Sequence, residues 1–285
     1  MTRAAMKGLP FGKRMLATTL LTLLSRRQLV RFARFLDYQG RLDVPNSMET
    51  NGELEVQRRV LRRDARQNST FLDVGANVGD WTSALLTAAR DTEIEVHLFD
   101  PAPAACQMLR ARFASQIESG SLVVNEIGLS EGSGTAELHV VGPAAGTNSL
   151  HAQHGLEEQD RVRVHLTTID DYCEERGVEH VGLLKVDTEG HDLSVLRGGT
   201  RLLRNQSIDV AQFEYNHRWI FSRSFLKDAF DFLGPLGYRV GKITPLGIEL
   251  YESWHPELET FHEGNYVALR AGVDDWFTSI PWWGP

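Results

Sequence analysis

The feature that most constrains this chain is residues 71–79, Phe-Leu-Asp-Val-Gly-Ala-Asn-Val-Gly, in which an apolar stretch runs directly into a glycine-containing loop. The apolar residues around Asp73 predict a short buried strand, and residues 81–89 predict the helix after the loop. Gly75 and Gly79 permit a tight turn that brings the backbone close to a ligand. The loop amides and the helix N-terminus would face that ligand. This order of elements indicates a cradle for a nucleotide-type cofactor, so we expect an enzyme.

The spacing of the glycines argues against a dinucleotide. A dinucleotide-binding loop has glycines at its first, third and sixth positions, but Gly75 is followed at those places by Asn77 and Asp80. The pattern acid-x-Gly-x-Asn-x-Gly instead resembles the turn with which class I methyltransferases hold S-adenosylmethionine. The cationic sulfonium and ammonium groups of that cofactor favour a nearby carboxylate such as Asp73.

A second acid is expected about 25 residues downstream, where it would end the next strand and accept hydrogen bonds from the ribose hydroxyls. Residues 95–101, Glu-Val-His-Leu-Phe-Asp-Pro, supply it as Asp100.

Residues 183–193, Leu-Leu-Lys-Val-Asp-Thr-Glu-Gly-His-Asp-Leu, followed by Val-Leu-Arg-Gly-Gly at 195–199, narrow the family. They are similar to the Lys-x-Asp-x-Glu-Gly signature of FkbM-type methyltransferases. Asp100 departs from that family, which more often carries Glu there, and the shorter acid alters the reach to the ribose. The resemblance spans roughly residues 50–270, and its matching segments are Glu53, Glu55, 73–79, 99–101, 148–150, 168–170, 185–191 and 213–216.

Strands and helices are predicted to alternate, which is typical of an α/β fold with a mainly parallel sheet and helices on both faces. The resemblance implies a Rossmann-like class I methyltransferase fold, and the pattern predicts a seven-stranded sheet, an inserted β-hairpin and N-terminal helices. We expect strands near 70–75, 94–99, 122–127, 182–187, 208–214, 237–243 and 264–270. We expect helices near 53–66, 80–90, 103–118, 168–177, 191–204 and 222–234. Alternation at 135–141 and 161–167 predicts the hairpin, whose loop would close over a substrate.

The length of 285 residues exceeds the roughly 200 of a minimal doubly wound domain. We therefore expect a basic helical extension at 1–48, the methyltransferase domain at 49–270 and an aromatic tail at 271–285. The tail would dock on the domain or contact a sugar, a subunit or a membrane interface. The cysteines, Cys106 and Cys173, lack metal-like spacing, which suits a reducing cytosol.

Charge is unevenly distributed. Residues 1–34 carry eight of the 30 Lys and Arg and none of the 38 Asp and Glu, so 22 bases face 38 acids in the remainder. An acidic body argues against nucleic acid as a substrate. Residues 15–24 are apolar but too few for a span of about 20 residues, and no cleavage pattern follows them. We expect a cytoplasmic protein. Its N-terminal helix either packs on protein, in the same chain or in a homo-oligomer, or contacts the inner face of a membrane peripherally.

Ligands of open α/β sheets bind beyond the carboxyl ends of the strands, which is where the predicted acids lie. The cofactor-binding candidates are Glu55, Asp73, Gly75, Asn77, Gly79 and Asp100. The catalytic candidates are Asp187, Glu189, His191 and Glu214. Asp187, Glu214 and His217 lack the spacing of a metal site, so no metal is expected.

Several candidates have a structural alternative. Asp187 either acts as a general base or substrate orienter at the acceptor hydroxyl or caps the helix that starts near Gly190, and Glu189 either acts in catalysis or accepts from loop amides. His191 would be neutral near a helix N-terminus, or simply a surface histidine. Glu214 is catalytic or a cap. Lys185, in an apolar run, needs a carboxylate partner and forms a structural salt bridge or orients a catalytic acid.

The resemblance implies an S-adenosylmethionine-dependent O-methyltransferase acting on a hydroxyl of a glycan, glycolipid or polyketide-type natural product. Two alternatives stay open at this point. One is a nicotinamide-dependent oxidoreductase that tolerates the imperfect glycine pattern, and the other is a cofactor-binding scaffold without turnover.

Overall fold

The computed structural model describes residues 10–63, 69–89, 92–153, 155 and 157–284. The chain forms two compact units, Met1–Val44 and Pro45–Pro285, which are described separately. The first unit contains helices α1 (Phe11–Leu23) and α2 (Arg26–Gly40), which confirms the prediction of N-terminal helices. Ser25 and Gln28 form a capping box that fixes the start of α2. None of the described helices is both long and apolar enough to cross a membrane.

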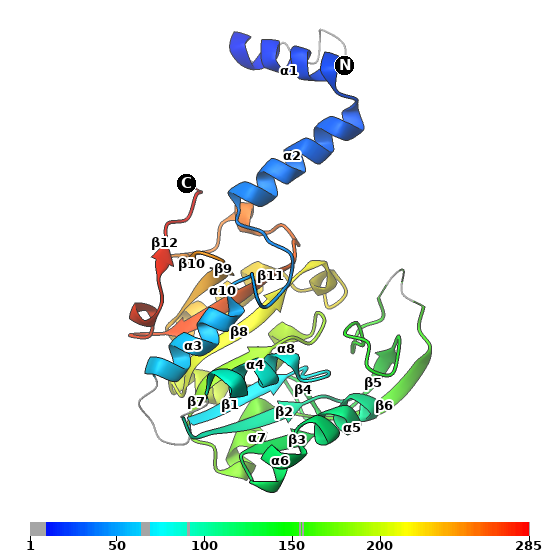
Figure 1. Ribbon diagram of the computed structural model, residues 1–285, viewed down its shortest axis with the longest axis vertical. Helices are drawn as coiled ribbons and strands as arrows, with labels where there is room; N and C mark the ends of the chain where they lie inside the picture. Colours follow the sequence, from blue (N-terminus) through cyan, green and yellow to red (C-terminus); the bar gives the residue numbers. More distant parts are fainter. Residues whose placement is uncertain (1–9, 64–68, 90–91, 154, 156, 285) are drawn as a thin grey trace. The chain divides into compact units, whose positions relative to one another are not determined.

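The second unit is built on a sheet whose strands run in the order β12-β10-β9-β11-β8-β7-β1-β2-β3 (Figure 1). The five strands from β8 to β3 are parallel, and β11 is antiparallel to both β8 and β9. The sheet therefore confirms the predicted, mainly parallel α/β fold. Its strands are β1 (Ser69–Val74), β2 (Ile94–Phe99), β3 (Leu122–Asn125), β7 (Val181–Val186), β8 (Ile208–Tyr215), β9 (Tyr238–Thr244), β10 (Gly247–Leu250), β11 (Gly264–Arg270) and β12 (Ser279–Ile280).

Seven of these strands match the predicted ones, and β10 and β12 extend the sheet beyond the predicted seven. Residues Gly247 to Leu250 fold back on β9 as an antiparallel hairpin, and residues 279–280 of the aromatic tail pair with β10. Both additions are too short to give a clear alternation of apolar and polar residues.

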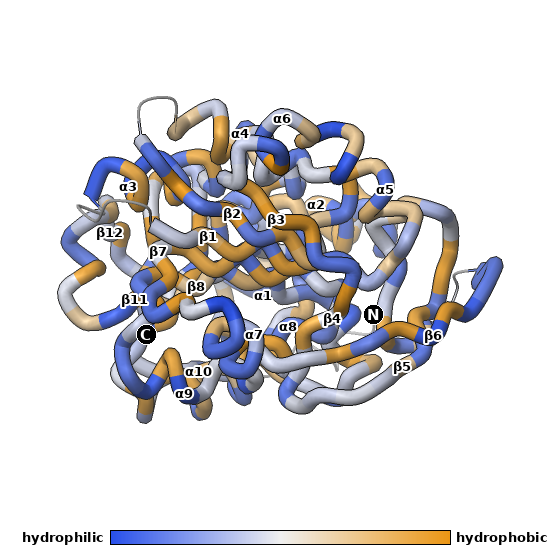
Figure 2. The backbone as a smooth tube through the Cα atoms, turned by 90° about the horizontal axis from the view of Figure 1, so that it is seen from below, coloured by the Kyte–Doolittle hydropathy of each residue, from blue (hydrophilic) through white to orange (hydrophobic). Residues whose placement is uncertain are grey.

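Two hydrophobic layers enclose the sheet because side chains of a strand alternate between its faces. Leu72 and Val74 join one core cluster, whereas Phe71 joins the other. Every residue of β1, β7 and β8 is buried, and Figure 2 shows the hydrophobic residues concentrated along the central strands. The helices are α3 (Glu53–Arg63), α4 (Asp80–Ala88), α5 (Pro103–Arg112), α6 (Ala114–Glu118), α7 (Ile169–Arg176), α8 (Asp192–Arg197), α9 (Thr200–Arg204) and α10 (Leu226–Leu233).

Two of the predicted helices are each divided in two. The chain breaks at Phe113, between α5 and α6, and again at Gly198 and Gly199, between α8 and α9. A Cβ on Gly198 would lie 2.1 Å from the carbonyl oxygen of Ser130, so close backbone approach accounts for the second break. The 3-10 turns η2 (His217–Ile220), η3 (Gly234–Leu236), η4 (Pro256–Leu258) and η5 (Asp274–Trp276) complete the unit.

The predicted β-hairpin is present and forms an arm beside the main sheet. Its strands β5 (Gly134–Val140) and β6 (Asp160–Thr167) pair antiparallel from Gly134 opposite Leu166 to Val140 opposite Asp160. The short strand β4 (Gly128–Leu129), which the sequence did not predict, adds a parallel edge. We call residues 141–153 the arm loop.

The strand order places a crevice next to β1. The chain proceeds from β1 to β2 and β3 on one side and returns to β7 and β8 on the other. Ligands of such sheets bind at this switch point, beyond the carboxyl ends of the strands.

Candidate active site

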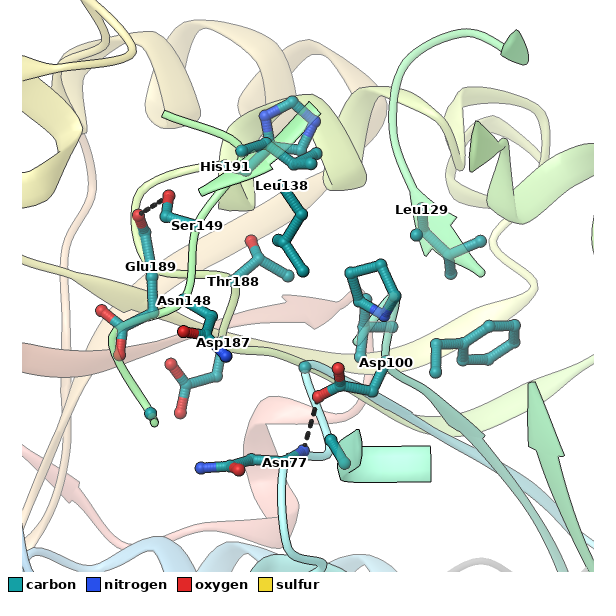
Figure 3. A pocket seen from close by; sticks show the side chains of 18 of the residues that line it. Asn77, Asp100, Leu129, Leu138, Asn148, Ser149, Asp187, Thr188, Glu189 and His191 are labelled. Carbon is teal, nitrogen blue, oxygen red and sulfur yellow. Dashed lines mark hydrogen bonds between the residues drawn. The ribbon is translucent and has the colours of Figure 1, made fainter. Parts of the chain in front are cut away.

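A pocket of about 630 Å³ lies at the carboxyl ends of β1, β2 and β7 (Figure 3). Asn77, Asp100 and Asp187 line it from the loops after these strands. The arm loop contributes Asn148 and Ser149, so the predicted loop does lie at the pocket. A pocket at a switch point is typical of a small-molecule or cofactor site.

Gly75 brings the loop after β1 against the loop after β7. It has φ +81°, and a Cβ on it would lie 1.8 Å from the carbonyl oxygen of Asp187. The amides of Gly75 and Ala76 both donate to the carbonyl oxygen of Phe99. Only glycine fits this position, because both the left-handed backbone and the close approach exclude a side chain. Bare backbone therefore borders the pocket.

Gly79 has a different role from Gly75. It has φ +82°, and its Cβ would meet the rings and methyl groups of Phe113 and Leu109 rather than the pocket. It begins α4 and allows the helix to pack closely. Gly79 therefore shapes the loop without lining the pocket.

Asp100 is positioned by backbone amides. One carboxylate oxygen accepts from the amide of Asn77 at 2.9 Å, and the other accepts from the amide of Ala102 at 2.9 Å. Burial raises the pKa of Asp100 to about 6, against the effect of these hydrogen bonds. Each oxygen keeps a second lone pair, so the carboxylate can still accept hydrogen bonds from a ligand in the pocket.

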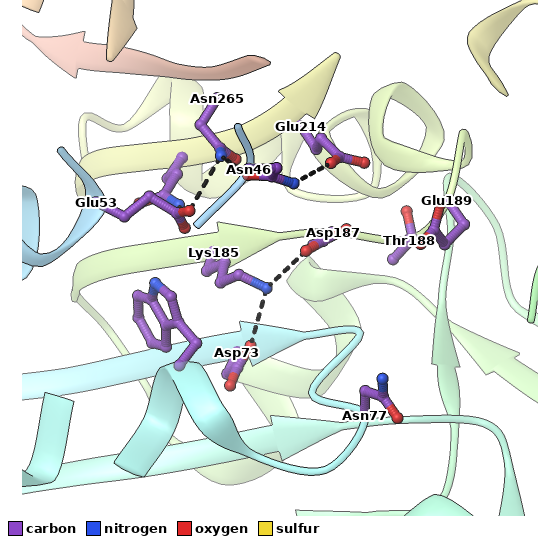
Figure 4. A network of polar contacts seen from close by, with 12 residues as sticks. Asn46, Glu53, Asp73, Asn77, Lys185, Asp187, Thr188, Glu189, Glu214 and Asn265 are labelled. Atoms are coloured by element: carbon purple, nitrogen blue, oxygen red, sulfur yellow. Dashed lines mark hydrogen bonds and ion pairs between the residues drawn. The ribbon is translucent and has the colours of Figure 1, made fainter. Parts of the chain in front are cut away.

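Lys185 lies between two of the predicted acids (Figure 4). Its Nζ is 3.1 Å from Oδ2 of Asp187 and 3.7 Å from Oδ1 of Asp73. Burial lowers the pKa of Lys185, but the carboxylates of Asp187, Asp73 and Glu53 outweigh this effect and raise it. The lysine is therefore a buried cation. Lys185 thus links Asp73, near the end of β1, to Asp187, directly after β7.

Asp73 is fully buried and lies behind the loop, not in the wall of the pocket. Its Oδ2 accepts from the hydroxyl of Thr82 at 2.6 Å. Burial raises the pKa of Asp73, and Lys185 opposes this shift. Asp73 therefore stabilises the loop after β1 through its contacts with Thr82 and Lys185.

Glu55 does not reach this site. Its carboxylate pairs with Arg58 and Arg59 on the outer side of α3, and it borders a separate surface groove. Glu53, two residues earlier, is buried and accepts from Asn51, Gln212 and Asn265. Positions two apart on a helix face different directions, and it is Glu53 that faces the charged network.

Glu214 is held by two asparagine amides. Asn46 donates to one carboxylate oxygen at 2.9 Å, and Asn216 donates to the other. Burial raises the pKa of Glu214 well above its usual range, and Asp187 and Glu189 add to this effect. Glu214 does not line the pocket itself, but it belongs to the same acidic network (Figure 4).

Glu189 lines the pocket with an unusual backbone, φ +56°. Its carboxylate is 2.8 Å from Nη1 of Arg218, and its carbonyl oxygen accepts from the Ser149 hydroxyl at 2.9 Å. Burial and the charge of Asp187 raise the pKa of Glu189 to about 8, and Arg218 opposes them. Glu189 therefore connects the loop after β7 to the arm loop and to the residues after β8.

His191 also lines the pocket, and both of its ring nitrogens are engaged. Nδ1 is 3.1 Å from Nε2 of His151 in the arm loop, and Nε2 is 2.9 Å from the hydroxyl of Ser130. Burial, and then the proximity of His151, lower the pKa of His191 to about 4. The imidazole is neutral near pH 7, as we expected, but burial is the cause.

Asp187 does not cap the helix after β7, because the N-cap of α8 is His191, which makes no side-chain cap hydrogen bond. It is Asp192 that holds the loop before the helix. Its carboxylate oxygens accept from the amides of Thr188 and Gly190, at 3.3 and 3.2 Å. Asp187 is thus left to pair with Lys185 and to face the pocket. Asn148 closes the turn of the arm loop, because its Oδ1 accepts from the amide of Val141 and its Nδ2 donates to the carbonyl of Gly142.

The structure brings six of the candidates to the pocket wall: Gly75, Asn77, Asp100, Asp187, Glu189 and His191. Asp73 and Glu214 lie in the network behind it, Gly79 shapes the loop, and Glu55 lies apart. Sequence reasoning missed Asn46, Gln212, Asn265, Arg218, Ser130 and His151. No local motif identifies them, because they meet the site only through the tertiary fold.

The pocket suits S-adenosylmethionine. Thr188 lines it with a buried hydroxyl that has no hydrogen-bond partner among the described residues. Ile127, Leu129 and Leu138 provide an apolar wall of the kind that a flat base requires. Asp73 and Asp187 place two carboxylates beside the single cation of Lys185, which favours a cationic ligand. Among the described residues, no His, Cys, Asp and Glu side chains are grouped so as to hold a metal ion.

Comparison with known proteins gives one family and several distant relatives. A model of the methyltransferase FkbM domain matches residues 73–240. The hexuronic acid methyltransferase AglP of Haloferax volcanii is 27% identical over 164 residues, covering 58% of this chain and 63% of that protein. The methyltransferase sdnD of Sordaria araneosa is 27% identical over 158 residues, covering 46% of this chain and 60% of that protein. The chain thus spans less than two thirds of either relative. A solved structure of the methyltransferase FkbM from Methylobacillus flagellatus KT is 15% identical, with a TM-score of 0.46, over 73% of this chain and 46% of that one.

Proposed function

Because this chain belongs to the FkbM methyltransferase family, we propose that it is an S-adenosylmethionine-dependent O-methyltransferase that acts on a hydroxyl group of a glycan, glycolipid or polyketide-type natural product. When bound, the cofactor supplies an electrophilic methyl group on a positively charged sulfonium. The observation that carries the proposal is the pocket at the switch point, where the backbone of Gly75 meets that of Asp187 and Asp100 faces inward.

Binding is assigned to three parts of the pocket wall. Asp100 accepts hydrogen bonds from the ribose hydroxyls with its free lone pairs. The bare backbone at Gly75 and the side chain of Asn77 border the space beside it. The negative potential of Asp73, Asp187 and their neighbours stabilises a cationic ligand, and Lys185 offsets only part of that charge.

Proton removal is assigned to Asp187. It faces the pocket, and Lys185 fixes its orientation at 3.1 Å. A carboxylate positioned in this way accepts a hydroxyl proton as the new bond forms. Glu189 is engaged by Arg218 and His191 by two hydrogen bonds, so both act as positioning groups for the arm loop. Most of the rate then comes from orientation and from exclusion of water by the arm loop.

The charge around the pocket favours a neutral acceptor group. Asp187, Glu189 and Glu214 lie in one acidic network (Figure 4). Burial raises the pKa of Glu189 to about 8 and that of Glu214 well above its usual range, so Asp187 is the acid of these three that carries charge into the pocket. The Asp187 carboxylate would repel an entering carboxylate, whereas a hydroxyl would meet it as a hydrogen-bond acceptor. The name of the AglP relative supports a sugar acceptor. We therefore propose that a sugar hydroxyl, and not a sugar carboxylate, receives the methyl group.

The test is methyl transfer from radiolabelled S-adenosylmethionine to a panel of neutral sugars, hexuronic acids and phenolic polyketides. We expect label in base-stable ethers of the sugars. Base-labile label, released as methanol, would show ester formation and contradict the hydroxyl assignment. Cofactor binding without transfer to any acceptor in the panel would favour the scaffold alternative.

A further inference from the structure

Helix α2 carries an apolar stripe on one face and a basic stripe on the opposite face. In an α-helix, residues spaced by three, four and seven positions share a face. The apolar stripe consists of Leu29, Phe32, Ala33 and Leu36. The basic stripe consists of Arg27, Arg31 and Arg34. At 3.6 residues per turn, the two stripes lie on opposite sides of the helix.

Within residues 10–44, the described part of this unit, neither stripe of α2 has a partner. Helix α2 buries none of its side chains against α1. Among the described residues of the unit, the three arginines of the basic stripe have no hydrogen bond or ion pair. Residues 10–40 hold six Lys and Arg and one acid, Asp37. The unit therefore presents apolar surface and unpaired positive charge together.

The difference in charge between the two units indicates which kind of partner the first unit binds. Residues 45–285 carry 21 bases and 36 acids, so an anionic surface repels that part of the chain and attracts the first unit. A lipid surface offers an apolar interior beneath a layer of anionic headgroups, which matches a helix with an apolar face opposite a basic face. Helix α1 adds further apolar residues and no acid.

We propose that the unit Met1–Val44 binds an anionic lipid surface through α2, with the apolar stripe among the acyl chains and the basic stripe at the phosphate groups. Such a contact holds the catalytic unit at the membrane, where a glycolipid acceptor resides. The lipid contact itself requires neither the cofactor nor turnover, so its test is independent of the proposed function.

The experiment measures co-sedimentation of the full-length chain with phosphatidylcholine vesicles, with and without about 30% phosphatidylglycerol. We expect binding to the anionic vesicles alone and its loss at high salt. The triple variant R27Q/R31Q/R34Q should bind roughly 100-fold more weakly, because each basic residue contributes about 1 kcal/mol at such a surface. The variant F32S/L36S should also bind more weakly.

Two variants serve as controls. R62Q/R163Q/R204Q removes as many positive charges from exposed arginines of the second unit and should bind like the wild type. R27K/R31K/R34K keeps the charge of the basic stripe and should also bind, which separates loss of charge from loss of helix structure.

Three outcomes would overturn the proposal. The first is equal binding to neutral and anionic vesicles. The second is an equal loss in R62Q/R163Q/R204Q and R27Q/R31Q/R34Q. The third is absence of vesicle binding by the wild type, together with a dimer that R27Q/R31Q/R34Q dissociates, because α2 would then dock on the acidic unit of a second copy.

Discussion

Gly75 and Asp187 are in backbone contact across the switch point of the sheet. A Cβ on Gly75 would lie 1.8 Å from the carbonyl oxygen of Asp187, and the amide of Asp187 donates to the carbonyl of Val74 at 2.9 Å. The cofactor loop after β1 and the acidic loop after β7 therefore form one rigid unit. This contact links the proposed binding groups to the proposed base.

Gly75→Ala should disrupt both the fold of the loops and cofactor binding. The matched control is Gly272→Ala, because Gly272 has φ +82° but nothing within 4 Å of its Cβ. The control should lose about 1 kcal/mol of unfolding free energy from backbone strain alone. Gly75→Ala should lose about 3 kcal/mol or more, since Asp187 must also move. Urea denaturation measures both, and equal losses would refute the close approach.

Asp100 should make cofactor affinity depend on pH. Its pKa, raised to about 6 by burial, leaves it ionised at pH 7 and protonated below pH 6. A proton removes acceptor capacity for the ribose hydroxyls, so S-adenosylhomocysteine should bind roughly tenfold more weakly for each unit below pH 6.

Asp100→Asn should abolish that dependence and weaken binding by about 1–3 kcal/mol. Asp80→Asn changes an exposed acid that pairs with Arg112 and should leave the pH profile unaltered. Calorimetric titration with S-adenosylhomocysteine at intervals of about one pH unit, from about pH 5 to about pH 8, measures these affinities. If the affinity of the wild type for S-adenosylhomocysteine did not change with pH, Asp100 would not be the acceptor for the ribose hydroxyls.

Asp187→Asn should reduce kcat by about 10²–10⁴-fold and leave the Kd for S-adenosylhomocysteine nearly unchanged. Lys185 would keep Asp73 and Glu53 as partners, so the site should stay folded. Asp192→Asn is the comparison, since Asp192 accepts from loop amides and does not line the pocket. Near-normal turnover of Asp187→Asn on the acceptor found in the panel would show that another group takes the proton.

His191 should contribute to acid destabilisation. Its folded-state pKa of about 4 lies below the unfolded value of about 6.5, so the unfolded chain takes up the proton first. The stability that its neutral form contributes is present above pH 6.5 and is lost as pH falls toward 4, by up to about 3 kcal/mol. His191→Gln should reduce the pH dependence of the free energy of unfolding in this range. His165 is exposed, so His165→Gln should leave that dependence unchanged. An unchanged acid profile in His191→Gln would contradict the burial argument.

The framework of the fold could be predicted because its elements have strong local signals. The strands β1, β7 and β8 are buried on both faces and appear as apolar runs in the sequence. The split of the predicted helix at 191–204 could not be predicted, because it depends on the carbonyl of Ser130, a residue far away in sequence.

The same distinction applies to the site. Asp100 and Asp187 follow strands directly, so their place at the sheet edge follows from the fold class. The structure places Glu55 outside the network and Glu53 inside it, and the sequence holds the signal for Glu53, which is spaced three and seven residues from the buried Val56 and Val60. Asn46 gave no signal, because its partner Glu214 lies 168 residues away.

The most direct test of the central claim is calorimetric titration of the full-length protein with S-adenosylhomocysteine, with NAD as the parallel ligand. We predict micromolar binding of S-adenosylhomocysteine, weakened by Asp100→Asn, and no binding of NAD. Binding of NAD, or no binding of S-adenosylhomocysteine by the folded protein, would contradict the account.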